Sequence, residues 1–288
     1  MKNFKDRRDG KRVNNVNGMN YIMYHLKKKR CESEVYVNQA IDVTNLIKYV
    51  DKINKENNGK HITYFHVFAT AIGKVIYNRP YLNRFIVNGH FYDRNEVTVS
   101  YVAKIKFNDD SKELMQVLNI KEDDNLFSVS DNLTKTVEKT RNNSSSGTDN
   151  FVATLGKMPK PIRSFVVGIF KFLDKHDLVP IAMTKQIIYY SSVIISNIGS
   201  VGSKAAIYHN ITDFGTNSIL ITMGKIYKKE IITDDGKKEI RDFCDFGITL
   251  DERIADGFYM IKSIQLLEYI LANPKLLEDD CNAKVEIK

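Results

Sequence analysis

A sharp break at Asp256-Gly257 divides the C-terminal part of this chain into an extended segment and a helical one. After the break, apolar residues recur at steps of three and four, which predicts a helix with one buried face: Ile261, Ile264, Leu267 and Leu271. The stretch Leu250–Tyr259 (LDERIADGFY) joins the two segments. A strand that ends in acidic residues and turns at a glycine into a helix places polar side chains at a sheet edge, where functional groups often lie. The residues alone are compatible with a charged surface turn or with a functional site.

The composition is that of a globular protein. With 288 residues, 43% of them hydrophobic, the chain can form one large domain or two small ones. Its three cysteines, Cys31, Cys244 and Cys281, are isolated and lack metal-ligand spacing, so we expect a reduced, cytoplasmic protein without bound metal. The longest apolar run, Phe165–Leu173, is about half the length of a membrane span and contains Lys171.

The formal charge of +8 is compatible with an anionic, phosphate-bearing ligand. Because the lysines are scattered and not interleaved with aromatic residues, the sequence does not favour nucleic acid as a partner. Residues 151–178 are apolar and basic. They predict either an amphipathic helix on a membrane surface or, as the favoured alternative, a helical pair that covers a sheet or forms a subunit contact.

Hydrophobic periodicity predicts an α/β protein with a mixed sheet and helices on one side. Residues 1–30 should form an arm that packs on the main body. Thr44 and Thr63 are the expected caps of two helices, and Asn88-Gly89 is the expected turn of a hairpin. The other expected elements are strands at 34–42, 97–107, 114–120, 217–225 and 239–250, a helix at 125–141, and a hairpin turn at 233–237.

The acidic corner resembles a motif of the CoA-dependent acyltransferases. DERIADGFY is similar to the HxxxDG segment of the catalytic domain of 2-oxo acid dehydrogenase acyltransferases, often DHRxxDG, and of chloramphenicol acetyltransferase, HHxxxDGFH. Asp256 and Gly257 match both forms, and Arg253 matches the dehydrogenase form. The position of the catalytic histidine is Glu252.

Further segments resemble the same family in the same order along the chain. IDVTNL and FATAIGKVIYNRPYLN resemble segments of the dehydrogenase acyltransferases, as do IISNIGSVG and the closing ILANPKLLE. FGTNSILITMGKIY is closer to chloramphenicol acetyltransferase. The ordered set implies the CoA-dependent acyltransferase fold, with a mixed sheet covered by helices, in one catalytic domain over residues 1–288 that has no lipoyl or subunit-binding domain.

The resemblance also implies a site and its ligands. In the family, three identical subunits assemble, and each active site lies between two subunits and takes CoA or an acyl-CoA as substrate. By correspondence, Ser196 would donate a hydrogen bond to the oxyanion, Glu252 would stand in for the base, and Asp256 would pair with Arg8 or Arg12. Gly257, Arg253 and Asn197 would be structural. Association with other dehydrogenase-complex subunits, which would supply any lipoyl group, is a further implication.

The acyltransferase activity that we expect depends on Glu252. A carboxylate, with a reference pKa about two units below that of imidazole, loses roughly 3 kcal/mol of driving force as a base toward a thiol, or about a hundredfold in rate. His209, in a loop between two motif strands, is the candidate substitute base. We expect weakened or altered acyltransferase activity; the alternative is a non-catalytic trimeric scaffold or acyl-CoA-binding protein.

Overall fold

The computed structural model describes residues 5–56, 61–104, 113–143, 147–204 and 206–287. Its main element is a mixed seven-stranded sheet with the order β2-β10-β8-β7-β5-β6, in which β9 pairs with the outer part of β10. The strands are β2 (Glu34–Asp42), β5 (Val97–Lys104), β6 (Glu113–Ile120), β7 (Val193–Asn197), β8 (Ile219–Met223), β9 (Tyr227–Ile232) and β10 (Lys238–Asp251). Among the strand pairs of the described residues, only β5–β7 and β7–β8 are parallel. The mixed sheet predicted from the sequence is confirmed.

The N-terminal arm packs on the body through a small second sheet. Strand β1 (Gly10–Arg12) pairs with β4 (His90–Arg94), which pairs with β3 (Arg84–Val87). The turn between β3 and β4 has positive φ at Asn88 (52°) and Gly89 (77°). Two consecutive positive φ angles give the tight turn that matches strand twist, so the predicted Asn-Gly hairpin is confirmed.

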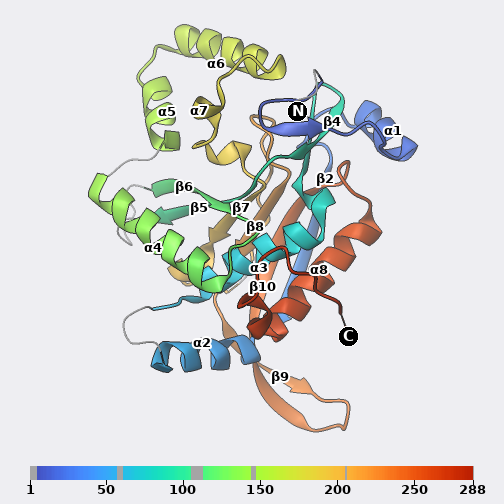
Figure 1. Ribbon diagram of the computed structural model, residues 1–288, viewed down its shortest axis with the longest axis vertical. Coiled ribbons are helices and arrows are strands. Elements are labelled where there is room, and N and C mark those ends of the chain that lie inside the picture. Colours follow the sequence, from blue (N-terminus) through green and yellow to red (C-terminus); the bar gives the residue numbers. More distant parts are fainter. Residues whose placement is uncertain (1–4, 57–60, 105–112, 144–146, 205, 288) are drawn as a thin grey trace.

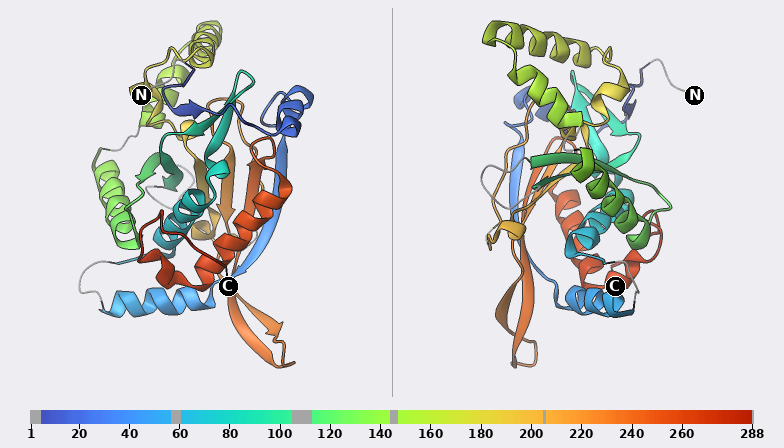
Figure 2. Two further views of the ribbon diagram at one scale, coloured as in Figure 1. Left: turned by 45° about the vertical axis from the view of Figure 1, so that its right-hand side comes forward. Right: turned by 90° about the vertical axis from the view of Figure 1, so that its left-hand side faces the viewer.

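One face of the main sheet is covered by some of the helices, as expected (Figures 1 and 2). They are α2 (Thr44–Glu56), α3 (Tyr64–Asn78), α4 (Leu126–Asn143) and α8 (Gly257–Ala272). Thr63 caps α3 by accepting a hydrogen bond from the His66 amide at 3.3 Å. Thr44 does not cap α2: it is the first helical residue, and its hydroxyl accepts from the Asp242 amide of β10 instead.

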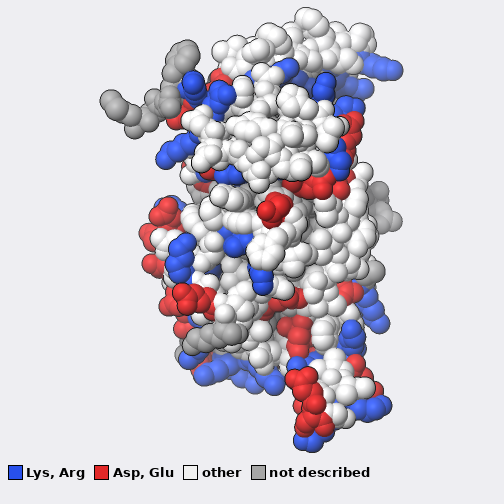
Figure 3. Space-filling model, turned by 90° about the vertical axis from the view of Figure 1, so that its right-hand side faces the viewer, with Lys and Arg blue, Asp and Glu red and all other residues white. Residues whose placement is uncertain are grey.

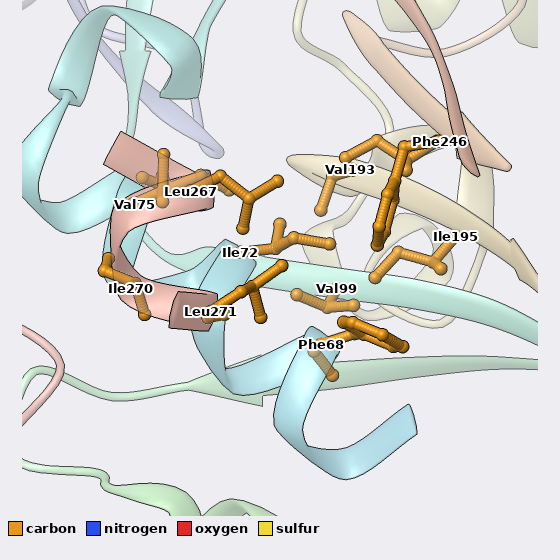
Figure 4. Close-up of a cluster of buried hydrophobic side chains, with 14 of the residues drawn as sticks. Phe68, Ile72, Val75, Val99, Val193, Ile195, Phe246, Leu267, Ile270 and Leu271 are labelled. Carbon is orange, nitrogen blue, oxygen red and sulfur yellow. The ribbon is translucent and has the colours of Figure 1, made fainter. Parts of the chain in front are cut away.

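The core lies between α3, α8 and the sheet. Side chains from both helices point at one another and at the inner face of β5, β7 and β10 (Figure 4): Phe68, Ile72, Val75, Val99, Val193, Ile195, Phe246, Leu267, Ile270 and Leu271. Each fully buried side chain of this size stabilises the fold by about 1.5–3 kcal/mol. Residues Val67 to Ile76 of α3 are all buried, because this helix is apolar nearly all round.

The remaining helices of the described residues lie toward the upper end of the molecule in Figure 1, and short 3-10 turns lie elsewhere in the described chain. They are α1 (Gly18–Leu26), α5 (Gly147–Gly156), α6 (Lys160–Lys175) and α7 (Ile181–Thr184); the turns are η1 (Pro80–Asn83), η2 (Ile188–Tyr190), η3 (Ile198–Val201) and η4 (Pro274–Leu277).

Helix α6 does not cover the sheet, so that part of the prediction for residues 151–178 is wrong. Only Phe170 and Asp174 of this helix are buried, whereas Phe165 and Phe172 are 68% and 60% exposed. Figure 3 shows a largely uncharged surface at this upper end, with Lys and Arg at its margins, and charged side chains on the projecting β9–β10 hairpin at the lower end. Among the described residues, no helix combines the length and apolar character that crossing a bilayer requires.

Candidate active site

The acidic corner begins with a buried ion pair. Asp251, the last residue of β10, is fully buried, and Arg253 is 2% exposed. The guanidinium of Arg253 donates from Nε to Oδ1 of Asp251 at 2.8 Å and from Nη2 to Oδ2 at 2.7 Å. This two-point geometry is the strong form of an Arg–carboxylate interaction. Nη1 of Arg253 also donates to the carbonyls of Lys27 and Lys28, at 2.9 and 3.0 Å, so the pair joins the corner to the segment between α1 and β2.

Glu252 lies between these two buried residues in the sequence, but its side chain contacts Lys27 and takes no part in their ion pair. Its amide donates to the Ser33 carbonyl at 2.9 Å, which extends the β2–β10 pairing by one residue. Its side chain is 27% exposed, and Oε1 accepts a hydrogen bond from Nζ of Lys27. The only charged group with which the Glu252 carboxylate is paired among the described residues is therefore a cation from the same chain.

Asp256 is the N-cap of α8. It is exposed, and Oδ1 accepts a hydrogen bond from the Tyr259 amide at 2.7 Å. The predicted pairing with Arg8 or Arg12 is not formed: Arg8 pairs with Asp174 and Asp177, and Arg12 contacts His90. The physical reason is local, because the free amides at the start of a helix lie within reach of the residue that precedes it.

Ser196 and Asn197 end strand β7. Ser196 lies opposite Thr222 of β8, and Thr222 lies opposite Gly247 of β10, five positions before Glu252. At about 3.3 Å per residue along a strand and about 4.8 Å between strands, Ser196 and Glu252 are on the order of 19 Å apart in one chain. Asn197 caps η3 by accepting from the Ser200 amide at 3.2 Å. One copy of the chain therefore does not bring the predicted oxyanion donor and base together.

His209 lies in the segment that precedes β8, where the neighbouring Ile207 carbonyl accepts a hydrogen bond from the Thr222 hydroxyl of the sheet. Its neighbour Tyr208 contacts Tyr36 with ring centroids 5.3 Å apart, and Asn210 accepts from the Tyr36 hydroxyl at 3.1 Å. Tyr36 lies opposite Thr249, three positions before Glu252. The His209 side chain is exposed and has no hydrogen bond to other described residues.

A buried polar cluster beside the corner was missed by the sequence reasoning. Arg30 is 6% exposed and donates to the carbonyls of Thr212 and Gly215, at 2.7 and 3.1 Å. Burial lowers the pKa of the Arg30 guanidinium, and burial also lowers the pKa of Arg94 to about 10. Residues Lys27 to Arg30 form a run of four cations in the sequence, a signal that could have identified this segment. In the described part of the chain, no group of three or more His, Cys, Asp or Glu side chains could hold a metal ion.

Comparison with known proteins agrees with this architecture. Residues 184–278 match the family model described as 2-oxoacid dehydrogenases acyltransferase (catalytic domain). A probable dihydrolipoamide acetyltransferase from Listeria monocytogenes 4b F2365 superposes with a TM-score of 0.59 at 17% identity, over 92% of this chain and 95% of that one. The chain has the fold of the CoA-dependent acyltransferases.

Two further acyltransferases share this fold. The dihydrolipoamide acetyltransferase of Azotobacter vinelandii gives a TM-score of 0.61 at 14% identity, over 92% of this chain and 93% of that one. A chloramphenicol acetyltransferase gives 0.55 at 12% identity, over 91% of this chain and 99% of that one. No curated protein matches the chain in sequence. The part that matches the acyltransferase family model contains both Ser196 and the acidic corner.

Proposed function

We propose that the chain is a CoA-thioester-dependent acyltransferase-like protein whose activity is weakened by Glu252. The observation that carries this proposal is the position of the acidic corner, at the β10–α8 junction within the segment that matches the family model. In the Azotobacter vinelandii enzyme, a serine, a histidine and an asparagine have a role in the catalytic mechanism, and the last two are four residues apart. Glu252 and Asp256 have the same spacing.

The proposed reaction transfers an acyl group from CoA to a thiol or hydroxyl acceptor. Glu252 takes the acceptor proton, and the acceptor sulfur or oxygen attacks the thioester carbonyl. The Ser196 hydroxyl donates a hydrogen bond to the oxygen on which negative charge develops. The carbon–sulfur bond to CoA then breaks, and the proton passes from Glu252 to the leaving thiolate. Glu252 can act as the base only after it separates from Lys27.

This chemistry requires a second copy of the chain. A base and an oxyanion donor must both lie within hydrogen-bond reach of the reacting groups, about 3 Å. The separation of about 19 Å between Ser196 and Glu252, from strand spacing, rules out a site made by one copy. We propose a homotrimer in which Glu252 of one copy faces Ser196 of the next. Association with further subunits of a dehydrogenase complex, and a cytoplasmic location, stay predictions.

The second candidate function is a non-catalytic scaffold or acyl-CoA-binding protein with the same assembly. The Lys27–Glu252 ion pair favours it, because Lys27 occupies a carboxylate oxygen that a base would have to present to the acceptor. In this function Ser196 and the corner would be retained for folding and ligand contact, without turnover.

Two measurements test these functions. Sedimentation equilibrium at micromolar concentration should give three times the 33.1-kDa chain mass, and a strict monomer would contradict the composite site. Calorimetric titration with CoA and acetyl-CoA should show binding. An absence of heat up to millimolar ligand would count against both the enzyme and the acyl-CoA-binding protein.

A further inference from the structure

A basic cleft lies next to the acidic corner. It has a volume of about 430 Å³, within the range of small-molecule sites. One wall includes the segment that joins α1 to β2, and another includes the C-terminal half of α6. The charged side chains that line it are six cations and two carboxylates: Lys28, Lys29, Arg30, Lys171, Lys175 and Arg253, with Asp174 and Asp213.

The two carboxylates in the cleft already have cationic or hydrogen-bonding partners. Asp174 pairs with Arg7 and Arg8, and Asp213 accepts from the amide of Arg30 at 2.7 Å. By contrast, three of the lysines have no acidic partner among the described residues: Lys28, Lys171 and Lys175. The cleft therefore has uncompensated positive charge on both walls.

A buried donor without a partner also lines the cleft. Arg30 is 6% exposed, and its Nε is buried with no hydrogen bond. Leaving a buried, charged donor unpaired costs about 1–3 kcal/mol or more, and the charge of a nearby anion would offset part of that cost. The Arg30 guanidinium, whose Nη atoms bond to the Thr212 and Gly215 carbonyls, adds fixed positive charge to the wall of the cleft and so favours an anion between the lysines.

The cleft is close to Glu252 along the chain and in space. Lys27 binds the Glu252 carboxylate, and the next residues, Lys28 to Arg30, line the cleft. Arg253, which follows Glu252, lines it as well. Because Lys27 neutralises Glu252, an anion in the cleft meets little repulsion from the corner.

We propose that this cleft binds the phosphate group of a small-molecule substrate of the proposed acyl transfer. The inference rests on that function only for the role of the ligand as a substrate; the anion site stands on the cleft itself. Phosphate fits the three unpaired lysines and the Arg30 guanidinium, since it combines high negative charge with several acceptor oxygens. This phosphate belongs either to the CoA donor or to a phosphorylated acceptor, and the titrations below distinguish the two.

The first test is a calorimetric titration of the full chain with inorganic pyrophosphate, carried out at low and at high salt. We expect binding that weakens with salt, and at least about a tenfold loss of affinity in Lys171→Ala/Lys175→Ala. The matched control is Lys157→Ala/Lys160→Ala, which removes the same charge from the same region of the chain, outside the cleft. It should stay within about twofold of the wild type. Circular dichroism verifies that both variants fold.

Parallel titrations with CoA distinguish the two sources of the phosphate. If Lys171→Ala/Lys175→Ala weakens CoA binding as much as pyrophosphate binding, the cleft holds the donor. If CoA binding is unchanged while pyrophosphate binding falls, the cleft holds the phosphate of the acceptor. If pyrophosphate binds and CoA does not, the anion site stands and the proposed acyl transfer fails. No pyrophosphate binding up to millimolar concentration, or equal losses in the variant and its control, would overturn the proposal, whatever the transfer assay shows.

Discussion

Replacing Asp251 by Asn should be among the most destabilising isosteric changes in this protein. The substitution keeps the shape of the side chain but removes the charge that balances Arg253, which is 2% exposed. It weakens both short hydrogen bonds, 2.8 and 2.7 Å, and leaves the guanidinium near the buried Arg30 with only the carbonyls of Lys27 and Lys28 as good acceptors. Breaking one partner of a buried pair costs about 3–5 kcal/mol.

That loss is a large share of the roughly 5–15 kcal/mol by which domains are usually stable. Urea unfolding followed by far-UV circular dichroism measures it for the wild type and Asp251→Asn. The matched control is Glu252→Gln, which breaks the neighbouring but partly exposed pair with Lys27 and should cost at most about 1 kcal/mol. Asp251→Leu/Arg253→Met should cost less than Asp251→Asn, because it leaves no buried guanidinium at position 253 without its carboxylate. A loss below about 1 kcal/mol for Asp251→Asn would refute this account of the corner.

Three other substitutions test local features. Asp256→Ala removes the cap of α8 and should cost about 1 kcal/mol in urea unfolding. Gly215→Ala should cost more than about 2 kcal/mol, because Gly215 has a φ of 81° and an added Cβ would meet the Tyr189 carbonyl oxygen at 2.2 Å. Burial, with a smaller effect of His61, lowers the pKa of His66 to about 4. Since the unfolded chain then binds the extra proton near pH 6.5, stability should fall by about 1–2 kcal/mol between pH 7 and pH 4 through this residue, after allowance for its partial exposure, and His66→Gln should lessen that dependence.

Each of these expectations has a clear contrary result. An Asp256→Ala variant as stable as the wild type would show that the cap is not needed. A Gly215→Ala variant with unchanged stability would mean that the backbone at this turn can move away from Tyr189. If the urea midpoint of His66→Gln changes with pH as steeply as that of the wild type, the pH dependence comes from other groups.

The sequence predicted the elements whose patterns are strong and local. The β2 strand, the Thr63 cap, the Asn88-Gly89 turn and the β10–α8 break depend on periodicity and on residues adjacent in the chain, and all are confirmed. Thr44 failed as a cap because a tertiary partner, the Asp242 amide, takes its hydroxyl. Local preference indicates which residues can cap a helix, but it does not show which distant group competes for them.

The site was less predictable, because its contacts join distant parts of the chain. Lys27 pairs with Glu252, and the buried Arg30 donates to the carbonyls of Thr212 and Gly215. These contacts depend on how the N-terminal arm packs against β10. No periodicity encodes such contacts. Asp256 was assigned a distant arginine by family correspondence, whereas in this chain it bonds to an amide three residues away.

The proposed function places Glu252 at the position of a catalytic base in a site that is otherwise equipped for acyl transfer. Chromatographic measurement of acetyl transfer from acetyl-CoA to a thiol acceptor tests it in the wild type, Glu252→His and Glu252→Gln. Since imidazole recovers about two pKa units of driving force, the histidine variant should exceed a low wild-type rate by about tenfold or more. A wild-type rate that falls in both variants would contradict the claim, because Glu252 would then be the tuned base of a fully active enzyme.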